Sequence, residues 1–193
     1  MPKVINHDAY REELVEQVQA LFAEHSYGSL GMRQIARELA ISKSALYHYF
    51  PTKEALFEAV CDRVVRIDLD GFARFVQGCE EGEYRLSTII RYCEENEDWF
   101  VQQFLLLGDF LRDKSVQEIR AYRALQNAHR EYLGFVQQFL ELDSEEEARG
   151  ILAFINGLIL TRFLDGKTTD FTETAAWFAR LVQSRKEGGE RWG

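Results

Sequence analysis

Proline and cysteine are scarce in this chain of 193 residues, and it has no long apolar run. The prolines are Pro2 and Pro51, so nothing interrupts helices over most of the sequence. No apolar stretch is long enough to span a membrane, and the first residues lack the apolar core of a secretory signal. The cysteines, Cys61, Cys79 and Cys93, are odd in number and widely spaced. They predict a reducing cytoplasm rather than a disulfide framework.

The chain also lacks strand-like alternation of apolar and polar residues over any useful length, internal repeats and low-complexity segments. Apolar residues recur at helical spacing instead, and at 46% of the chain they suffice for a packed core. The predicted fold class is therefore all-α, with about nine helices. The expected helices cover residues 8–25, 32–39, 43–49, 53–75, 84–95, 98–112, 116–140, 145–165 and 171–184.

Several of these helices begin with recognisable caps. Ser115-Val-Gln-Glu118 and Ser144-Glu-Glu-Glu147 have the Ser-x-x-Glu form of a capping box, and Asp170 precedes the last expected helix. Thr52 is expected to cap the fourth helix. The first helix ends at Tyr27-Gly28, where glycine can take the left-handed cap conformation.

Acidic residues outnumber basic ones, so the net charge is -9. The excess is unevenly spread, because residues 1–53 hold six Lys or Arg and six Asp or Glu, which leaves the whole -9 in residues 54–193. Residues 26–53 hold four basic residues and one acidic residue, a net +3. A local positive patch of this kind is compatible with a nucleic-acid partner, while the acidic remainder would repel phosphate.

The most specific feature of the sequence lies within residues 32–57. They read as a short helix, a tight turn at Ala40-Ile41-Ser42, a second short helix, a stop at Pro51 and a further helix. Two short helices that meet at such a turn place the second one in the major groove of DNA. Leu46 and Phe50 are expected to hold this second helix against the other two.

The same segment resembles the DNA-binding head of the TetR (tetracycline-repressor)/AcrR family of transcriptional regulators. The resemblance covers residues 9–57 and rests on Leu21-Phe22, Tyr27-Gly28, Ile35-Ala36, Ile41-Ser42-Lys43, Leu46-Tyr47-His48-Tyr49-Phe50 and Lys53-Glu54-Ala55-Leu56-Phe57. Beyond that the likeness is one of size and helical pattern only. It implies a homodimer that binds a double-stranded DNA operator in the cytoplasm, with repression as the default.

The resemblance also implies two domains and a set of contacts. Residues 1–53 would be the helix-turn-helix domain, with the motif at about 31–50 and a linking helix from residue 52, and residues 54–193 the effector-binding and dimerisation domain. Tyr47 and His48 would reach phosphates, Lys43 and Ser44 would lie near base edges, and Lys53 would hold a phosphate at the positive end of its helix. The expected DNA-binding residues are Arg33, Ser42, Lys43, Ser44, Tyr47, His48 and Lys53. For any one of them, the alternative is an ordinary solvated side chain.

Two positions depart from the family pattern. Gly31 stands where a serine or threonine usually caps the second helix, so only its backbone N–H remains for a phosphate. Ala40 replaces the usual turn glycine, and if that turn needs a positive φ the alanine costs about 1 kcal/mol.

The remaining helices offer candidates for a dimer interface and a sensor pocket. The last two helices are apolar on two sides, which fits burial against both the body and a second subunit, although one monomer core could use both sides. The expected interface residues are Ile151, Ile155, Leu158, Ile159, Phe171, Phe178 and Val182. Aromatic and polar residues over 99–135 could form a small-molecule pocket or plain core. The pocket candidates are Trp99, Phe100, Gln103, Phe104, Arg123, Gln126 and His129.

The predicted function is a sequence-specific transcriptional regulator, a repressor released from a palindromic operator by a small-molecule effector. Two alternatives stay open at this stage: a DNA-binding helical protein that senses nothing, and an all-α enzyme. The four histidines have no metal-ligand spacing, and no nucleophile elbow or phosphate loop is present. We therefore expect no catalytic residue, no metal, no cofactor and no membrane partner.

Overall fold

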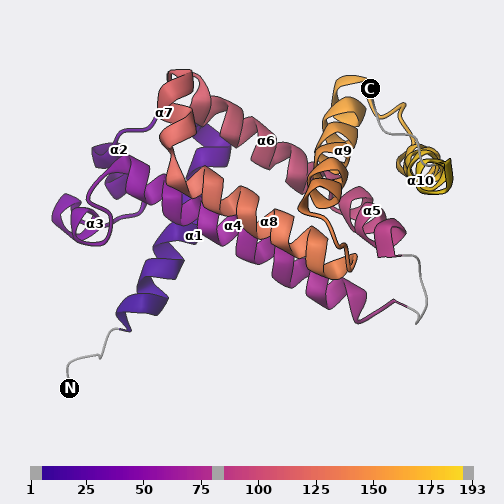
Figure 1. Cartoon of the computed structure of the whole chain (residues 1–193). Coiled ribbons are helices and arrows are strands. Elements are labelled where there is room, and N and C mark those ends of the chain that lie inside the picture. Colours follow the sequence, from indigo (N-terminus) through magenta and orange to yellow (C-terminus); the bar gives the residue numbers. More distant parts are fainter. Residues whose placement is uncertain (1–5, 80–84, 189–193) are drawn as a thin grey trace. The chain divides into compact units, whose positions relative to one another are not determined.

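The computed structural model of the chain describes residues 6–79 and 85–188, without the side chains of Arg85 and of residues 182–188. The described residues form ten α-helices and no β-strand, which confirms the all-α prediction (Figure 1). Not one of these helices is both long and apolar enough to cross a membrane. Their bounds are α1 His7–His25, α2 Met32–Glu38, α3 Lys43–Tyr49, α4 Lys53–Val76, α5 Arg85–Glu95, α6 Glu97–Leu111, α7 Val116–Ala121, α8 Arg123–Phe139, α9 Glu145–Leu164 and α10 Phe171–Gly188.

The described chain divides into two compact units that do not follow the order of the sequence. The first unit holds residues 6–70 and Gln102–Glu131, and the second holds residues 71–79, 85–101 and 132–188. Helices α4, α6 and α8 therefore each contribute residues to both units. The predicted boundary between residues 53 and 54 concerns function rather than compactness, and it stays a prediction.

The core of the first unit combines the N-terminal helices with the end of α6. Leu14, Val18 and Phe22, spaced four residues apart on α1, are all buried, as expected for one apolar face of a helix. Phe110 of α6 joins the same core, and its ring stacks on Phe57 with centroids 3.8 Å apart. The N-terminal helices thus share one core with a segment that is distant in the sequence.

The single helix expected over 116–140 is interrupted at Tyr122, so that prediction was wrong. Tyr122 has a ψ of 101°, an extended backbone that separates α7 from α8. Its hydroxyl donates a hydrogen bond to the Glu54 carbonyl at 3.1 Å, and its ring lies 4.8 Å from that of Phe110. Apolar periodicity depends only on residues that are close in the sequence, so it cannot show that Tyr122 contacts a distant segment. For this reason the sequence predicted a single helix there.

The predicted N-terminal caps form, but the exit of α1 differs from the expectation. A backbone N–H in the first turn of the following helix donates a hydrogen bond to each of the side chains of Thr52, Ser115, Ser144 and Asp170. At the end of α1 the residue with a positive φ is Ser26, at 62°, rather than Gly28. The Ser29 hydroxyl donates to the His25 carbonyl. This bond satisfies a carbonyl that the end of the helix leaves without its own partner.

The second unit is built on α5, α9 and α10 with the end of α8. The inward face of α9 carries Leu152, Ile155, Leu158 and Ile159, all buried. The rings of Phe154 and Phe178 stack with centroids 4.0 Å apart, which ties α9 to α10.

Candidate nucleic-acid interface

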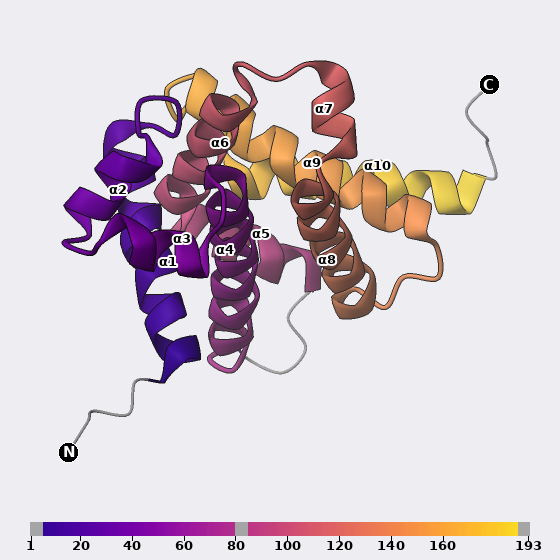
Figure 2. The ribbon, with the colours of Figure 1, turned by 90° about the vertical axis from the view of Figure 1, so that its left-hand side faces the viewer.

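Helices α2 and α3 lie side by side and meet at a tight turn (Figure 1 and Figure 2). The turn begins with a Schellman motif: the Ile41 N–H donates to the Ala36 carbonyl and the Ala40 N–H to the Arg37 carbonyl, both at 3.0 Å. Ala40 occupies the left-handed position of this motif with a φ of 53°. The turn therefore does need a positive φ, and the alanine there is strained by about 1 kcal/mol.

The start of α2 is the other departure from the family pattern. Gly31 is the N-cap residue, with extended backbone at φ -94° and ψ 157°, and it provides no side-chain cap. The first turn of α2 carries the exposed Arg33, and its last turn the exposed Arg37. A DNA phosphate at the start of α2 would therefore meet peptide N–H groups and the Arg33 guanidinium rather than a hydroxyl.

Helix α3 has one buried face, which packs on the core of the first unit, and one exposed face. Leu46 and Phe50 are 0% and 1% exposed, which confirms that they anchor the helix. Lys43, Tyr47 and His48 are exposed on the other face, and the Lys43 ammonium lies 5.3 Å from the centroid of the Tyr47 ring. The exposed face therefore presents a cation, hydroxyl groups and rings, which suit phosphates and base edges.

Ser42 has a role in the helix that the sequence did not reveal. It is the N-cap of α3, and its hydroxyl accepts a hydrogen bond from the Ala45 N–H at 3.1 Å. Ser44 is exposed one residue into the helix, with no such capping role. Of the two predicted serine contacts, Ser44 has the hydroxyl that is not already used to cap the helix.

Tyr49 links α3 to the start of α1. Its hydroxyl lies 2.8 Å from His7 Nδ1, and its ring meets that of Tyr10 edge to face at 5.5 Å. His48 lies against the same ring at 5.2 Å. These contacts fix the direction of α3 relative to α1, and no local pattern in the sequence could have shown the pairing of positions 7 and 49.

Lys53, the predicted phosphate anchor at the start of α4, turns inward in this structure. Its ammonium donates a hydrogen bond to the Tyr27 carbonyl and lies 3.9 Å from the centroid of the Tyr27 ring. Burial lowers the pKa of Lys53, and the neighbouring Glu54 and Asp109 carboxylates oppose that shift.

The predicted pocket residues do not fall within one compact unit. Trp99 and Phe100 belong to the second unit, whereas Gln103, Phe104, Arg123, Gln126 and His129 belong to the first. Arg123, Gln126 and His129 are exposed, and the Gln126 amide donates to the Arg120 carbonyl beside the break at Tyr122. Their role in ligand binding stays a prediction.

Most of the residues predicted for the dimer interface are buried or partly buried within the second unit. Ile155, Leu158, Ile159 and Phe171 are buried, Ile151 and Phe178 are partly buried, and the side chain of Val182 lies outside the described residues. Among the described side chains of α9 and α10, the large apolar ones that are exposed are instead Leu160, Phe163, Leu164 and Trp177. Residues buried within their own chain serve its core first.

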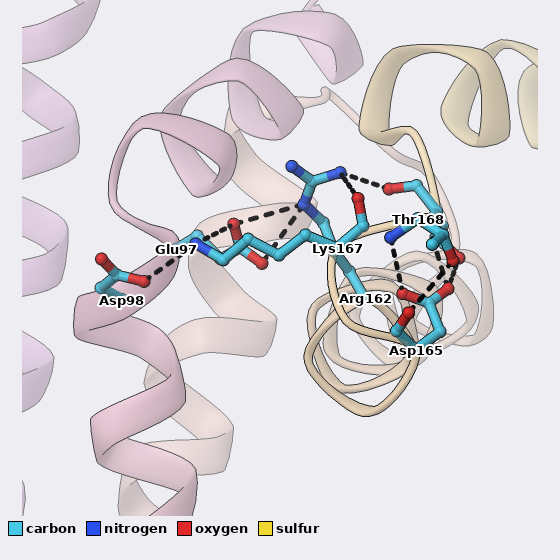
Figure 3. A network of polar contacts seen from close by, with 7 residues as sticks. Glu97, Asp98, Arg162, Asp165, Lys167 and Thr168 are labelled. Atoms are coloured by element: carbon cyan, nitrogen blue, oxygen red, sulfur yellow. Dashed lines mark hydrogen bonds and ion pairs between the residues drawn. The ribbon is translucent and has the colours of Figure 1, made fainter.

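A network of charged groups in the second unit holds the loop between α9 and α10 (Figure 3). The Arg162 guanidinium lies 3.2 Å from the buried Glu97 carboxylate and donates to the carbonyls of Lys167 and Thr169. Lys167 adds ion pairs to Glu97 at 3.3 Å and to Asp98 at 3.2 Å. Glu97 is therefore the carboxylate partner of Arg162, which lies on α9 among apolar side chains.

Comparisons with known proteins match both the helix-turn-helix and the fold. Residues 14–60 match the family described as bacterial regulatory proteins, tetR family. The HTH-type transcriptional regulator UidR of Escherichia coli strain K12 is 26% identical over 154 residues, 80% of this chain and 75% of UidR. The HTH-type transcriptional repressor AcnR of Corynebacterium diphtheriae is 28% identical over 132 residues, 66% of each chain. The crystal structure of a tetR-family transcriptional regulator from Streptomyces coelicolor has a TM-score of 0.65 at 18% identity, covering 96% of this chain and 86% of the other.

Proposed function

Since this chain belongs to the TetR family of bacterial regulatory proteins, we propose that it represses transcription from a palindromic operator and is released by a small-molecule effector. It is a helix-turn-helix transcriptional regulator. Its place of action is the cytoplasm, where bacterial DNA lies. The observation that carries the proposal is the exposed polar face of α3, held on a fully buried Leu46 beside the α2–α3 turn.

We assign DNA binding to the exposed face of α3 and to the first turn of α2. Lys43 and Ser44, in the first turn of α3, are the candidates for base edges, and Tyr47 and His48 for phosphates. Arg33 lies in the first turn of α2, where its exposed guanidinium suits the DNA backbone. One such head spans too few base pairs for high specificity, so the proposal includes a second copy that reads a half-site about 34–36 Å, or a multiple of that, away.

The exposed face of α9 is the surface we assign to that second copy. Gly150, Ala153, Gly157, Leu160 and Leu164 recur every three or four residues along α9, and all five are exposed. A Cβ atom added to either glycine meets no other described atom within 4 Å, outside the backbone of the helix itself. The packing of the described chain therefore does not require the small residues, whereas close approach of a partner helix would.

Effector release would act through the helices that run through both units. Residues of α4, α6 and α8 are shared between the units, so a ligand that favours one arrangement of these helices would change the presentation of α3. We expect the effector to be a small organic molecule, because polar side chains lie among the aromatic ones over residues 99–135. Candidate ligands that bind the purified dimer without changing operator affinity would contradict this part of the proposal.

Selection of bound duplexes from a random DNA pool tests the proposal directly. Wild-type protein should enrich a palindrome with half-sites spaced by whole turns of the double helix. A variant in which Lys43, Tyr47 and His48 are all replaced by alanine is the matched control and should enrich no sequence. Failure of the folded wild-type protein to enrich any duplex at low salt would contradict the proposed function.

A further inference from the structure

One peptide group in the first unit, between Tyr27 and Gly28, is held from both sides. Its N–H donates a hydrogen bond to Asp109 Oδ2 at 2.9 Å, and its carbonyl accepts one from the Lys53 ammonium at 2.5 Å. Asp109 lies near the end of α6, and Lys53 is the first residue of α4. The loop between α1 and α2 is thus attached to two other helices at a single peptide group.

The Asp109 carboxylate is suited to hold this loop. Its side chain is only 9% exposed, and its second oxygen has an ion pair with Arg112 at 3.1 Å. A carboxylate removed from water is costly unless its oxygens are hydrogen-bonded or paired. The Gly28 N–H supplies such a bond, and hydrogen bonds to an ionised acceptor are stronger than neutral ones.

The Tyr27 ring is fixed by the same two helices as its peptide group. It meets the Phe110 ring of α6 edge to face at 5.0 Å, and the Lys53 ammonium lies 3.9 Å from its centroid. The Tyr27 hydroxyl donates to Glu54 Oε1 at 3.4 Å. A shift of α6 relative to α4 would therefore have to break contacts to both the ring and the backbone of residue 27.

We propose that Asp109 is a positioning residue for DNA binding, which together with Lys53 clamps the Tyr27–Gly28 peptide and so fixes how α2 and α3 leave α1. The inference rests on the operator binding proposed above. The Lys53 ammonium is then engaged with the Tyr27 carbonyl instead of a DNA phosphate, which departs from what the family resemblance implies for this position.

The first test compares Asp109→Ala with Asp113→Ala, which removes the same charge from an exposed position four residues further on. Removal of a negative charge by itself favours DNA, because phosphates repel carboxylates. The clamp predicts the opposite sign for Asp109→Ala, about tenfold weaker binding to the duplex that wild-type protein enriches. Asp109→Asn keeps an acceptor oxygen but not the charge, so its affinity should lie between those of Asp109→Ala and wild-type protein. Equal affinities for Asp109→Ala and Asp113→Ala would overturn the proposal.

Amide hydrogen exchange on the protein without DNA separates a positioning role from general unfolding. In Asp109→Ala the Gly28 amide should exchange at least about tenfold faster, while the amides of residues 56–60 in α4 keep their wild-type rates. An unchanged Gly28 rate, or equal acceleration at both places, would contradict the clamp. Because this measurement needs no DNA, it decides the clamp even if no duplex is enriched and the proposed function fails.

Lys53→Met tests the other side of the peptide. Methionine keeps an apolar stem over the Tyr27 ring but has no donor for the carbonyl. If the ammonium is engaged with Tyr27, operator affinity falls while the slope of log affinity against log salt stays the same. A slope reduced by about one would mean that Lys53 neutralises a phosphate, and that result would overturn its place in the clamp.

Discussion

The two compact units differ in what they leave at the surface. In the first unit the exposed face of α3 is polar, while the large side chains behind it, Leu46 and Phe50, are almost fully buried. In the second unit, α9 and α10 expose Leu160, Phe163, Leu164 and Trp177, at 43%, 44%, 73% and 56%. Single exposed apolar residues are common on proteins, but several on two adjoining helices indicate an interaction surface.

This difference indicates which unit has an apolar surface that only a partner could bury. The first unit completes its own core with Phe110 and Tyr122 from distant segments and leaves polar groups exposed on α3, while its exposed Leu105 and Val116 belong to α6 and α7. The second unit buries one side of α9 and leaves the other side apolar. DNA binding is thus proposed for the polar exposed face of α3, and dimerisation for the exposed apolar face of α9.

The largest expected effect is in the core of the first unit. Phe57→Ala removes a 2% exposed ring that stacks on Phe110, and should lower the free energy of unfolding by about 3–5 kcal/mol. Leu164→Ala, at an exposed position of the second unit, should change the stability of the monomer by less than about 0.5 kcal/mol. Urea unfolding of the dissociated monomers measures both, and similar losses in the two variants would contradict this difference between the units.

A bulky substitution on the exposed face of α9 tests the proposed dimer interface without changing the core of the monomer. Gly157→Leu should weaken dimerisation at least about tenfold, because an added side chain would hold two close-packed helices apart. Gly134→Leu in α8 is the matched control, since a Cβ there also meets no other described atom within 4 Å. Sedimentation equilibrium measures both variants. A Gly157→Leu protein that dimerises like the control would place the interface elsewhere.

Single substitutions on α3 test whether its exposed face binds DNA without supporting the fold of the first unit. Lys43→Ala and Tyr47→Ala should each cost about 1–3 kcal/mol of operator affinity at a base contact, or reduce the salt slope by about 1 at a phosphate. Neither should alter the thermal midpoint, because both side chains are exposed. Gln17→Ala, an exposed change on α1, is the control for binding. Destabilisation by either α3 variant would mean that the face also supports the fold.

The smallest expected effect is at the α2–α3 turn. Ala40→Gly should raise the free energy of unfolding by about 0.5–1 kcal/mol, because glycine adopts a φ of 53° without the steric cost of a Cβ atom. Ala36→Gly, in the helix interior of α2, should have the opposite sign. Chemical unfolding of both variants checks the pair. Destabilisation by Ala40→Gly would show that this turn does not strain the alanine.

Most of the helices, their caps and the position of the helix-turn-helix were predictable from the sequence alone. The reason is that these features depend on residues three or four positions apart, as Thr52 and Ala55 or Ser115 and Glu118 illustrate. The strained turn at Ala40 belongs with them, because a positive φ follows from the local geometry of the α2 terminus.

The tertiary structure alone decided the pairings that cross the sequence. Asp109 lies 81 residues from the Gly28 amide that it binds, and Glu97 lies 65 residues from Arg162. Periodicity marked α9 as apolar on two sides, but only packing determined that Ile155 and Ile159 face inward while Leu160 and Leu164 stay exposed. Local patterns state that a residue must be buried or paired, whereas its partner depends on which distant segment fills the adjoining space.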